Sequence, residues 1–157
     1  MKKLISLFLC VAILSFFGCS AATNTVELKS SYSQTATVKT GTFTYTANIK
    51  YDGKCVYITP TSTNASGMTI SCSGKTVAFS RRDMLNKADK SNVSPYNPAV
   101  LLYDVLTSVE FGKKSNNNYI FGGKTSVGNY TLTVNESSEL LSLNIPDAEF
   151  SIEFDVK

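Results

Sequence analysis

The feature that most constrains this chain is a strict alternation of apolar and polar residues. In the stretch FTYTANIKY, Phe43 to Tyr51, every second residue is apolar and every residue between is polar. Side chains of a β-strand point alternately to its two faces, so this pattern predicts a strand with one buried face. The same alternation recurs in NYTLTV and in FSIEFDV, where it places Phe150, Ile152, Phe154 and Val156 on the inner face. The sequence therefore predicts a sheet with one apolar face, which must curl, pair or be covered.

Turn signals set an expected register for these strands. Asp52-Gly53 is a strong hairpin signal and predicts that Ile49 lies opposite Val56. The turn at 73–76 predicts Cys72 opposite Val77. In the closing run, LLSLNI is expected to bring Leu141, Leu143 and Ile145 back opposite the apolar face of NYTLTV. The strand near 117–126 contains Gly122-Gly123, which suggests a bulge or a close backbone approach.

One segment has helical rather than strand periodicity. Asn97 is a candidate N-cap, and Pro98 suits the first helical position. The apolar residues that follow recur with helical spacing and form one face: Leu101, Leu102, Val105, Leu106 and Val109. We expect a polar loop over 86–97 before this helix. The predicted order is five strands, the loop and helix, and four strands, joined mostly by hairpins as an antiparallel meander.

The N-terminus reads as an export signal. Two lysines precede an apolar run that ends at Gly18, and residues 1–18 are expected to be removed. The junction Phe16-Phe17-Gly18-Cys19 resembles a bacterial lipobox, which implies cleavage before Cys19 and acylation of that cysteine. The remaining interpretations are secretion without a lipid and a buried N-terminal helix. The expected organisation is a signal peptide at 1–18, a lipidated cysteine and flexible tether at 19–34, and one domain at 35–157.

Composition excludes several function classes. The chain has 15 Lys and Arg against 12 Asp and Glu, and loss of Lys2 and Lys3 would leave a net charge of +1. That near neutrality argues against a nucleic-acid partner. The chain contains no histidine, which removes the commonest general base and metal ligand. We find no catalytic, phosphate-binding or metal-binding motif, so no cofactor, no metal and no enzymatic activity are expected.

The lipobox, the helix after NPAVLLYDVL and the closing run YTLTVNESSELLSLNIPDAEFSIEF together make the chain similar to the LolA/LolB and LppX/LprG superfamily. The resemblance implies a mainly β (α+β) fold: a curved, unclosed antiparallel half-barrel of about nine strands, with one amphipathic helix covering the concave face. It also implies an envelope protein, lipid-anchored to the plasma membrane or the outer membrane, that holds a lipid, a lipoprotein or another partner. Members commonly have a further helix near the domain start, which the sequence does not predict between residues 20 and 42.

Two non-enzymatic functions follow from this resemblance and the pattern. In the first, an apolar cup binds a lipid, a lipoprotein or another apolar ligand, and Arg81 and Arg82 could meet its headgroup. In the second, the cup is a solid core and the sheet surface or an edge strand docks on an envelope protein, such as a cell-wall enzyme. The candidate cup residues are Tyr45, Ile49, Phe79, Leu102, Leu106, Tyr130, Leu143, Phe150 and Phe154.

Two cysteines remain in the domain. Export favours a disulfide between Cys55 and Cys72. The strand pattern disagrees, because Cys72 shares the inner face with Ile70, whereas Cys55 shares the opposite face with Tyr57. A direct bridge would need a bulge, so both a disulfide and a pair of free thiols stay open.

Overall fold

The computed structural model describes residues 27–109 and 112–156. The expected signal segment, Cys19 and the first part of the tether lie outside the described residues. The strands are β1 (Tyr32–Thr40), β2 (Phe43–Tyr51), β3 (Val56–Pro60), β4 (Met68–Ser73), β5 (Thr76–Arg81), β6 (Met84–Asp89), β7 (Lys113–Ser115), β8 (Asn118–Thr125), β9 (Gly128–Asn135), β10 (Leu140–Ile145) and β11 (Phe150–Phe154). The described helices are α2 (Pro98–Ser108) and the short 3-10 turns η1 (Lys90–Asn92) and η2 (Pro146–Ala148).

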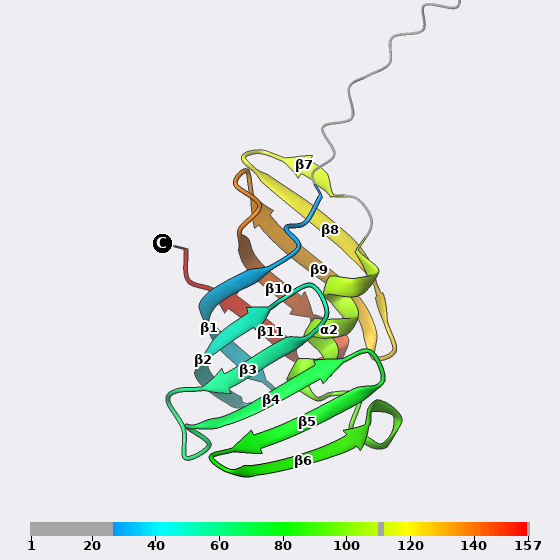
Figure 1. Ribbon diagram of the computed structural model, residues 1–157. Helices are drawn as coiled ribbons and strands as arrows, with labels where there is room; N and C mark the ends of the chain where they lie inside the picture. The colour runs from blue at the N-terminus through cyan, green and yellow to red at the C-terminus, as the bar shows by residue number, and fades with distance from the viewer. Residues whose placement is uncertain (1–26, 110–111, 157) are drawn as a thin grey trace, which may run out of the picture.

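All strands belong to one open antiparallel sheet with the order β6-β5-β4-β3-β2-β1-β11-β10-β9-β8-β7. Two meanders, β1 to β6 and β7 to β11, are joined by pairing of β1 with β11, so the ends of the domain meet in the middle of the sheet. The free edges are β6 and β7, and α2 lies in the connection between them. Figure 1 shows the sheet curling so that its two arms face each other across α2. The mainly β, open antiparallel prediction is confirmed.

The strand count differs from the expected nine, because β6 and β7 were not predicted. β6 occupies part of the segment 86–97, which was expected to be a polar loop. Five of its six residues are exposed. Its sequence therefore lacks the alternation of apolar and polar residues that predicts a strand with one buried face. β7 has three residues, all exposed. Both strands are held by backbone pairing with β5 and β8, which the side-chain pattern does not report.

The predicted helix is confirmed in place and in its capping. Asn97 accepts hydrogen bonds through Oδ1 from the backbone N–H groups of Ala99 (3.0 Å) and Val100 (3.4 Å), and Pro98 opens the helix. α2 contacts β3 and β4 in one arm and β8 in the other. Its buried residues are Ala99, Val100, Leu101, Leu102, Val105 and Leu106. The helix thus fills the space between the two arms of the sheet.

The expected register of the β2–β3 hairpin was wrong by two residues. Ile49 lies opposite Ile58, and Val56 lies opposite Tyr51. The cause is a longer loop, in which Asp52 Oδ1 accepts from the backbone N–H groups of Lys54 (3.0 Å) and Cys55 (2.8 Å). An Asp side chain that binds the backbone in this way replaces the two-residue turn. The shift is an even number of residues, so every side chain stays on its predicted face.

Three residues expected on the inner face are elsewhere. A register shift between Leu140 and Ser142 turns Leu140 inward, where it is buried, and leaves Leu141 only partly buried. Phe43 and Val156 are 55 % and 49 % exposed. Phe43 is the first residue of its strand and Val156 follows the last strand, so both alternations continue past the end of the core.

The ordered domain starts earlier than residue 35. β1 begins at Tyr32, which is buried and stacks on Tyr51 with ring centroids 6.4 Å apart. The Gln34 side chain, also within the segment expected to be a tether, donates to the carbonyl oxygen of Leu140 (3.0 Å) and accepts from its N–H (3.3 Å). These bonds satisfy the backbone N–H and C=O groups of Leu140 at the irregularity in β10. Among the described residues, no helix is long and apolar enough to cross a membrane.

Candidate functional site

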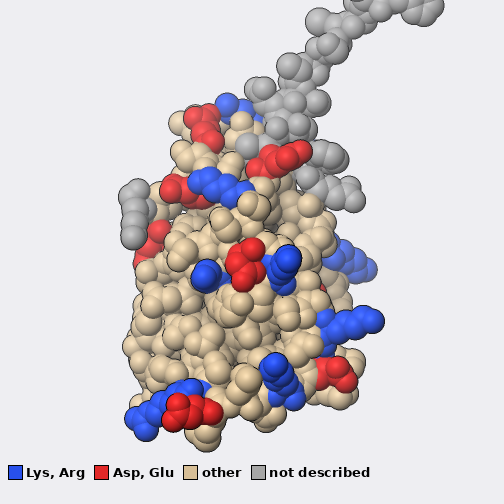
Figure 2. Space-filling view, in the orientation of Figure 1, with Lys and Arg blue, Asp and Glu red and all other residues tan. Residues whose placement is uncertain are grey.

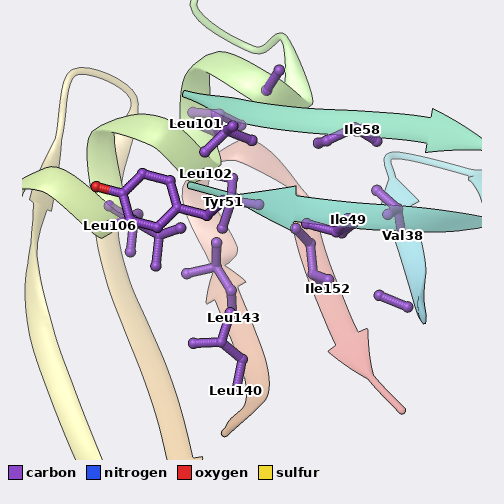
Figure 3. Close-up of a cluster of buried hydrophobic side chains, with 14 of the residues drawn as sticks. Val38, Ile49, Tyr51, Ile58, Leu101, Leu102, Leu106, Leu140, Leu143 and Ile152 are labelled. Atoms are coloured by element: carbon purple, nitrogen blue, oxygen red, sulfur yellow. The ribbon is translucent and has the colours of Figure 1, made fainter. Parts of the chain in front are cut away.

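The candidate cup residues come together, but as a packed core. Eight of them are buried in one hydrophobic cluster, whereas Phe79 is only partly buried at its margin. The eight are Tyr45, Ile49, Leu102, Leu106, Tyr130, Leu143, Phe150 and Phe154. Figure 3 shows side chains of α2 and of strands from both arms pointing into the same interior.

The space beneath α2 is filled by the helix itself. Leu101, Leu102 and Val105 are at most 1 % exposed, and none of them lines a cleft described below. Tyr130 covers Gly123 of β8 so closely that a Cβ there would lie 2.6 Å from its ring carbons. The expected close approach at the paired glycines is therefore present at Gly123. This contact leaves no space between Tyr130 and Gly123, and beside it a cleft of about 280 Å³ opens between the end of α2 and β8, lined by Ser108, Val109 and Phe121.

A first cleft, of about 780 Å³, lies beside the start of α2. Its lining includes Lys75, Asp89, Lys90 and Asp104, so two ammonium groups meet two carboxylates. Lys90 forms an ion pair with Asp104, and its ammonium nitrogen lies 5.3 Å from the centroid of the Tyr103 ring. The pair connects the segment after β6 to α2. This cleft therefore has balanced charge and a structural ion pair in its wall.

A second cleft, of about 680 Å³, lies where the described N-terminal segment meets the end of α2. Leu28, Tyr51, Leu106 and Val109 supply its apolar lining, and Glu27 and Lys29 supply opposite charges. Leu28 also packs against the core. Leu106 is thus the only one of the candidate cup residues on α2 that reaches one of these clefts.

A third cleft, of about 530 Å³, lies at the free end of the first arm, and we call it the open-end cleft. It is lined by Met68, Phe79, Ser80, Arg81, Asp83, Met84, Leu85 and Asn86. Cross-strand pairing assembles it, because Arg81 pairs with Met68 on one side and with Met84 on the other. Met84 is 69 % exposed and Leu85 is 60 % exposed. Met84 shares a face of the sheet with Met68 and Phe79, whereas Leu85 lies on the opposite face, so the edge strand exposes a large apolar side chain on each face, as interaction surfaces commonly do.

The two arginines of the hairpin tip lie next to this cleft. Arg81 lines the cleft, and Arg82 occupies the turn with φ of 52°, a left-handed conformation that is uncommon for a residue with a side chain. Both are exposed, as is Asp83. Figure 2 shows that acidic and basic side chains form small mixed groups on this face, with wide uncharged areas between them.

The perturbed pKa values lie away from the open-end cleft and have structural causes. Burial raises the pKa of Tyr45 to about 12 and that of the Cys72 thiol to about 11. The pKa of Asp52 is lowered, mainly by the backbone N–H of Cys55. These shifts move each group further from neutral pH, which suits folding rather than proton transfer. The described residues contain no group of three or more His, Cys, Asp or Glu that could hold a metal ion.

Both cysteines in the described part of the chain are free thiols. Cys72 is buried in the core and lies opposite Val77, as predicted, and opposite Val56 on its other side. Cys55 lies in the loop before β3 and is partly exposed. Cys72 points into the core from β4, whereas Cys55 lies outside the strands, and the two thiols are not bridged.

The residues that sequence reasoning missed are Met84 and Leu85. Both follow β5 in the run RRDML, from which only the two arginines were considered as possible ligand contacts. A usable signal was present, because two residues, Arg82 and Asp83, are enough to reverse a strand. Continued pairing from Arg81 to Met84 would have predicted an edge strand with exposed apolar side chains.

Comparison of the chain with known protein families found no family model that matches it. Comparison with curated proteins likewise found no match.

Proposed function

We propose that this chain is a membrane-anchored, non-enzymatic lipoprotein of the cell envelope that docks on a partner protein through the open-end cleft. Acylated Cys19 would hold the protein at the membrane, since two or more acyl chains anchor a soluble domain stably. The half-barrel interpretation of the sheet belongs to this proposal. The observation that carries it is the contrast between a filled interior and exposed apolar side chains at Met84 and Leu85.

The filled interior favours a protein partner over a lipid. A site for a free lipid must enclose most of the ligand, and binding pockets usually bury more than two-thirds of their ligand's surface. Leu101 and Leu102, which would form the roof of such a cavity, instead pack directly in the core. At the open-end cleft the apolar side chains stand free at a strand edge. A partner's side chain can fill such a cleft, as anchor side chains do at the centre of protein interfaces.

The polar rim of the open-end cleft suits this role. Arg81, Asp83 and Asn86 surround the apolar side chains and offer both donors and acceptors. Interfaces commonly combine an apolar centre with a polar rim, and arginine and methionine are enriched in them. The charges at the rim would set the orientation of the partner more than its affinity.

A second candidate function is the binding of an apolar ligand in the open-end cleft. The open-end cleft, at about 530 Å³, falls within the size range of small-molecule sites, and Met68, Phe79 and Met84, which share one face of the sheet, supply its apolar wall. An acyl chain of a lipid or lipoprotein is the ligand that this wall would fit. The site would then lie at the end of the first arm rather than beneath α2.

One experiment separates the two candidates. A photo-activated cross-linking amino acid is placed at Met84 of the full anchored chain in its bacterial host, and in a matched strain at Lys124, which is exposed on β8. We expect from position 84 one discrete adduct with a different protein, told by its mass from an adduct with a second copy of this chain, and none from position 124, with the adduct to the different protein lost when Phe79→Asp is added. A lipid adduct would support the second candidate. Absence of any adduct specific to position 84 would refute both.

The anchor has its own test. The variant Cys19→Ala should lose incorporation of labelled palmitate and move from the membrane fraction to the soluble fraction. The control is Cys55→Ala, which should retain both properties. Membrane attachment that survives Cys19→Ala would contradict the lipid anchor.

A further inference from the structure

The backbone of edge strand β6 is available for pairing along its outer side. β6 pairs with β5 from Thr76–Asp89 to Arg81–Met84 with no register shift, across a two-residue turn. In such a hairpin the residues next to the turn form a hydrogen-bonded pair, so every second residue of β6 bonds to β5. The N–H of Lys90 bonding to the carbonyl oxygen of Lys75 (2.7 Å) fits this alternation. Leu85, Lys87 and Asp89 therefore direct their N–H and C=O groups away from β5.

This edge has little of the protection that free edges usually have. Proline, bulges and very short length are the common devices against edge pairing. β6 has six residues, contains no proline and is regularly paired on its inner side. Leu85 is 60 % exposed on the outer face of the sheet. Lys87 and Asp89, which share that face, carry opposite charges, so this edge discriminates between partners by charge.

The charges are complementary to a second copy of the same edge in one register. Antiparallel pairing of two identical strands places a two-fold axis at one residue, and residues directly opposite share a face. With the axis at Leu85, that leucine meets its own copy, and Asp83, which lies in the turn just before β6, lies beside Lys87 on both sides. With the axis at Asn86, Asp83 would meet Asp89. With the axis at Lys87, two lysines would meet, so both alternatives put like charges opposite each other.

An axis at Ala88 would also pair Lys87 with Asp89. That register, however, puts Leu85 opposite Ser91, which lies in η1 rather than in a strand. It therefore loses the contact between the two exposed leucines, and only the small Ala88 side chains meet at its centre. Of these registers, only the axis at Leu85 combines opposite charges with contact between the two exposed leucines, and Leu85 directs its backbone groups outward.

We propose that β6 pairs antiparallel with β6 of a second copy of this chain, with the two-fold axis at Leu85, to give a dimer whose sheets are continuous. In this dimer, Met84 lies opposite Asn86 of the second copy, so the two open-end clefts adjoin across the axis. A partner would then meet one double cleft rather than two separate ones. The dimer does not depend on the proposed docking function, because it is formed by the chain alone.

Cysteine cross-linking tests the register directly. The full chain, membrane-anchored and carrying Cys55→Ser, receives either Leu85→Cys or Ala88→Cys. Directly opposed residues of a hydrogen-bonded antiparallel pair have Cα atoms about 5.5 Å apart, which suits a disulfide. On mild oxidation we expect Leu85→Cys to form a disulfide-linked dimer that a reducing agent separates. Ala88→Cys should give at least a tenfold lower yield of dimer. Equal or higher yield from Ala88→Cys, or no dimer from Leu85→Cys, would overturn the proposal.

A charge exchange keeps the test independent of cysteine chemistry. Lys87→Asp places two pairs of carboxylates opposite each other and should leave the full chain monomeric in detergent, as measured by light scattering. The double variant Asp83→Lys with Lys87→Asp restores opposite charges and should restore the dimer. Both residues are exposed, so both variants should fold. A double variant as monomeric as the single one would refute the register, whatever the cross-link at Met84 shows about a docking partner.

Discussion

Replacement of Leu102 by alanine tests whether the interior is packed or hollow. The side chain of Leu102 is fully buried on the face of α2 that meets the sheet. In a packed core, Leu→Ala removes the transfer free energy of the deleted atoms and leaves a cavity, at a cost of about 3 kcal/mol, within a range of roughly 2–5. For a domain of this size, that loss corresponds to a fall in the melting temperature of about 10 °C. Facing an empty cup, the same leucine would have fewer neighbours and its removal would cost less.

The measurement is urea unfolding of the domain, with the melting temperature as a second readout. The matched control is Thr107→Ala on the exposed side of the same helix, which should change the free energy of unfolding by at most about 0.5 kcal/mol. We expect the denaturant slope to stay constant, because the surface exposed on unfolding hardly changes. A cost below about 1 kcal/mol for Leu102→Ala would refute the packed interior. It would then favour lipid binding in the cup over protein docking.

Three further predictions concern the cap, one tyrosine and the thiols. Asn97→Ala should lower the free energy of unfolding by about 1 kcal/mol, because two backbone N–H groups lose their acceptor, whereas Asn97→Asp should keep most of it. Burial raises the pKa of Tyr45 from 10.0 to about 12, so its contribution to stability is complete below pH 10 and is lost as the pH rises toward 12. Urea unfolding across that range should show a smaller fall for Tyr45→Phe, and an unchanged fall would contradict this cause. Alkylation at mildly alkaline pH should modify Cys55 quickly and Cys72 only on unfolding, since burial raises the pKa of Cys72 to about 11; equal rates by mass spectrometry would count against the buried position.

The packed interior and the exposed cleft have a common physical origin. One helix has to cover the apolar face of an eleven-stranded sheet. α2 contacts β3, β4 and β8, and the end of the first arm extends beyond it. Phe79 and Met68 are partly buried there, while Met84 is free. A partner protein would complete at this end the cover that the helix provides elsewhere.

The sequence by itself determined which residues face inward and where the helix begins. Period-two alternation assigns the faces of β2, β9 and β11 whatever strand lies beside them, because it depends only on the geometry of one strand. For the same reason, the two-residue error after Asp52 changed no face. The cap of α2 is also local, since Asn97 and the N–H groups that it binds lie within three residues.

Only the tertiary structure decided how the strands are ordered and what fills the cup. Pairing of Ala36 with Phe154 joins segments more than a hundred residues apart, and no local pattern encodes that partner. The inward turn of Leu140 depends on a strand irregularity whose backbone is served by Gln34 from β1. β6 became an edge strand because backbone pairing with β5 needs no apolar face. The same helical pattern would suit a Leu102 that lines a cavity and a Leu102 that fills it. Long-range strand pairing sets the distance between the two arms of the sheet, and at that distance Leu102 is part of the core.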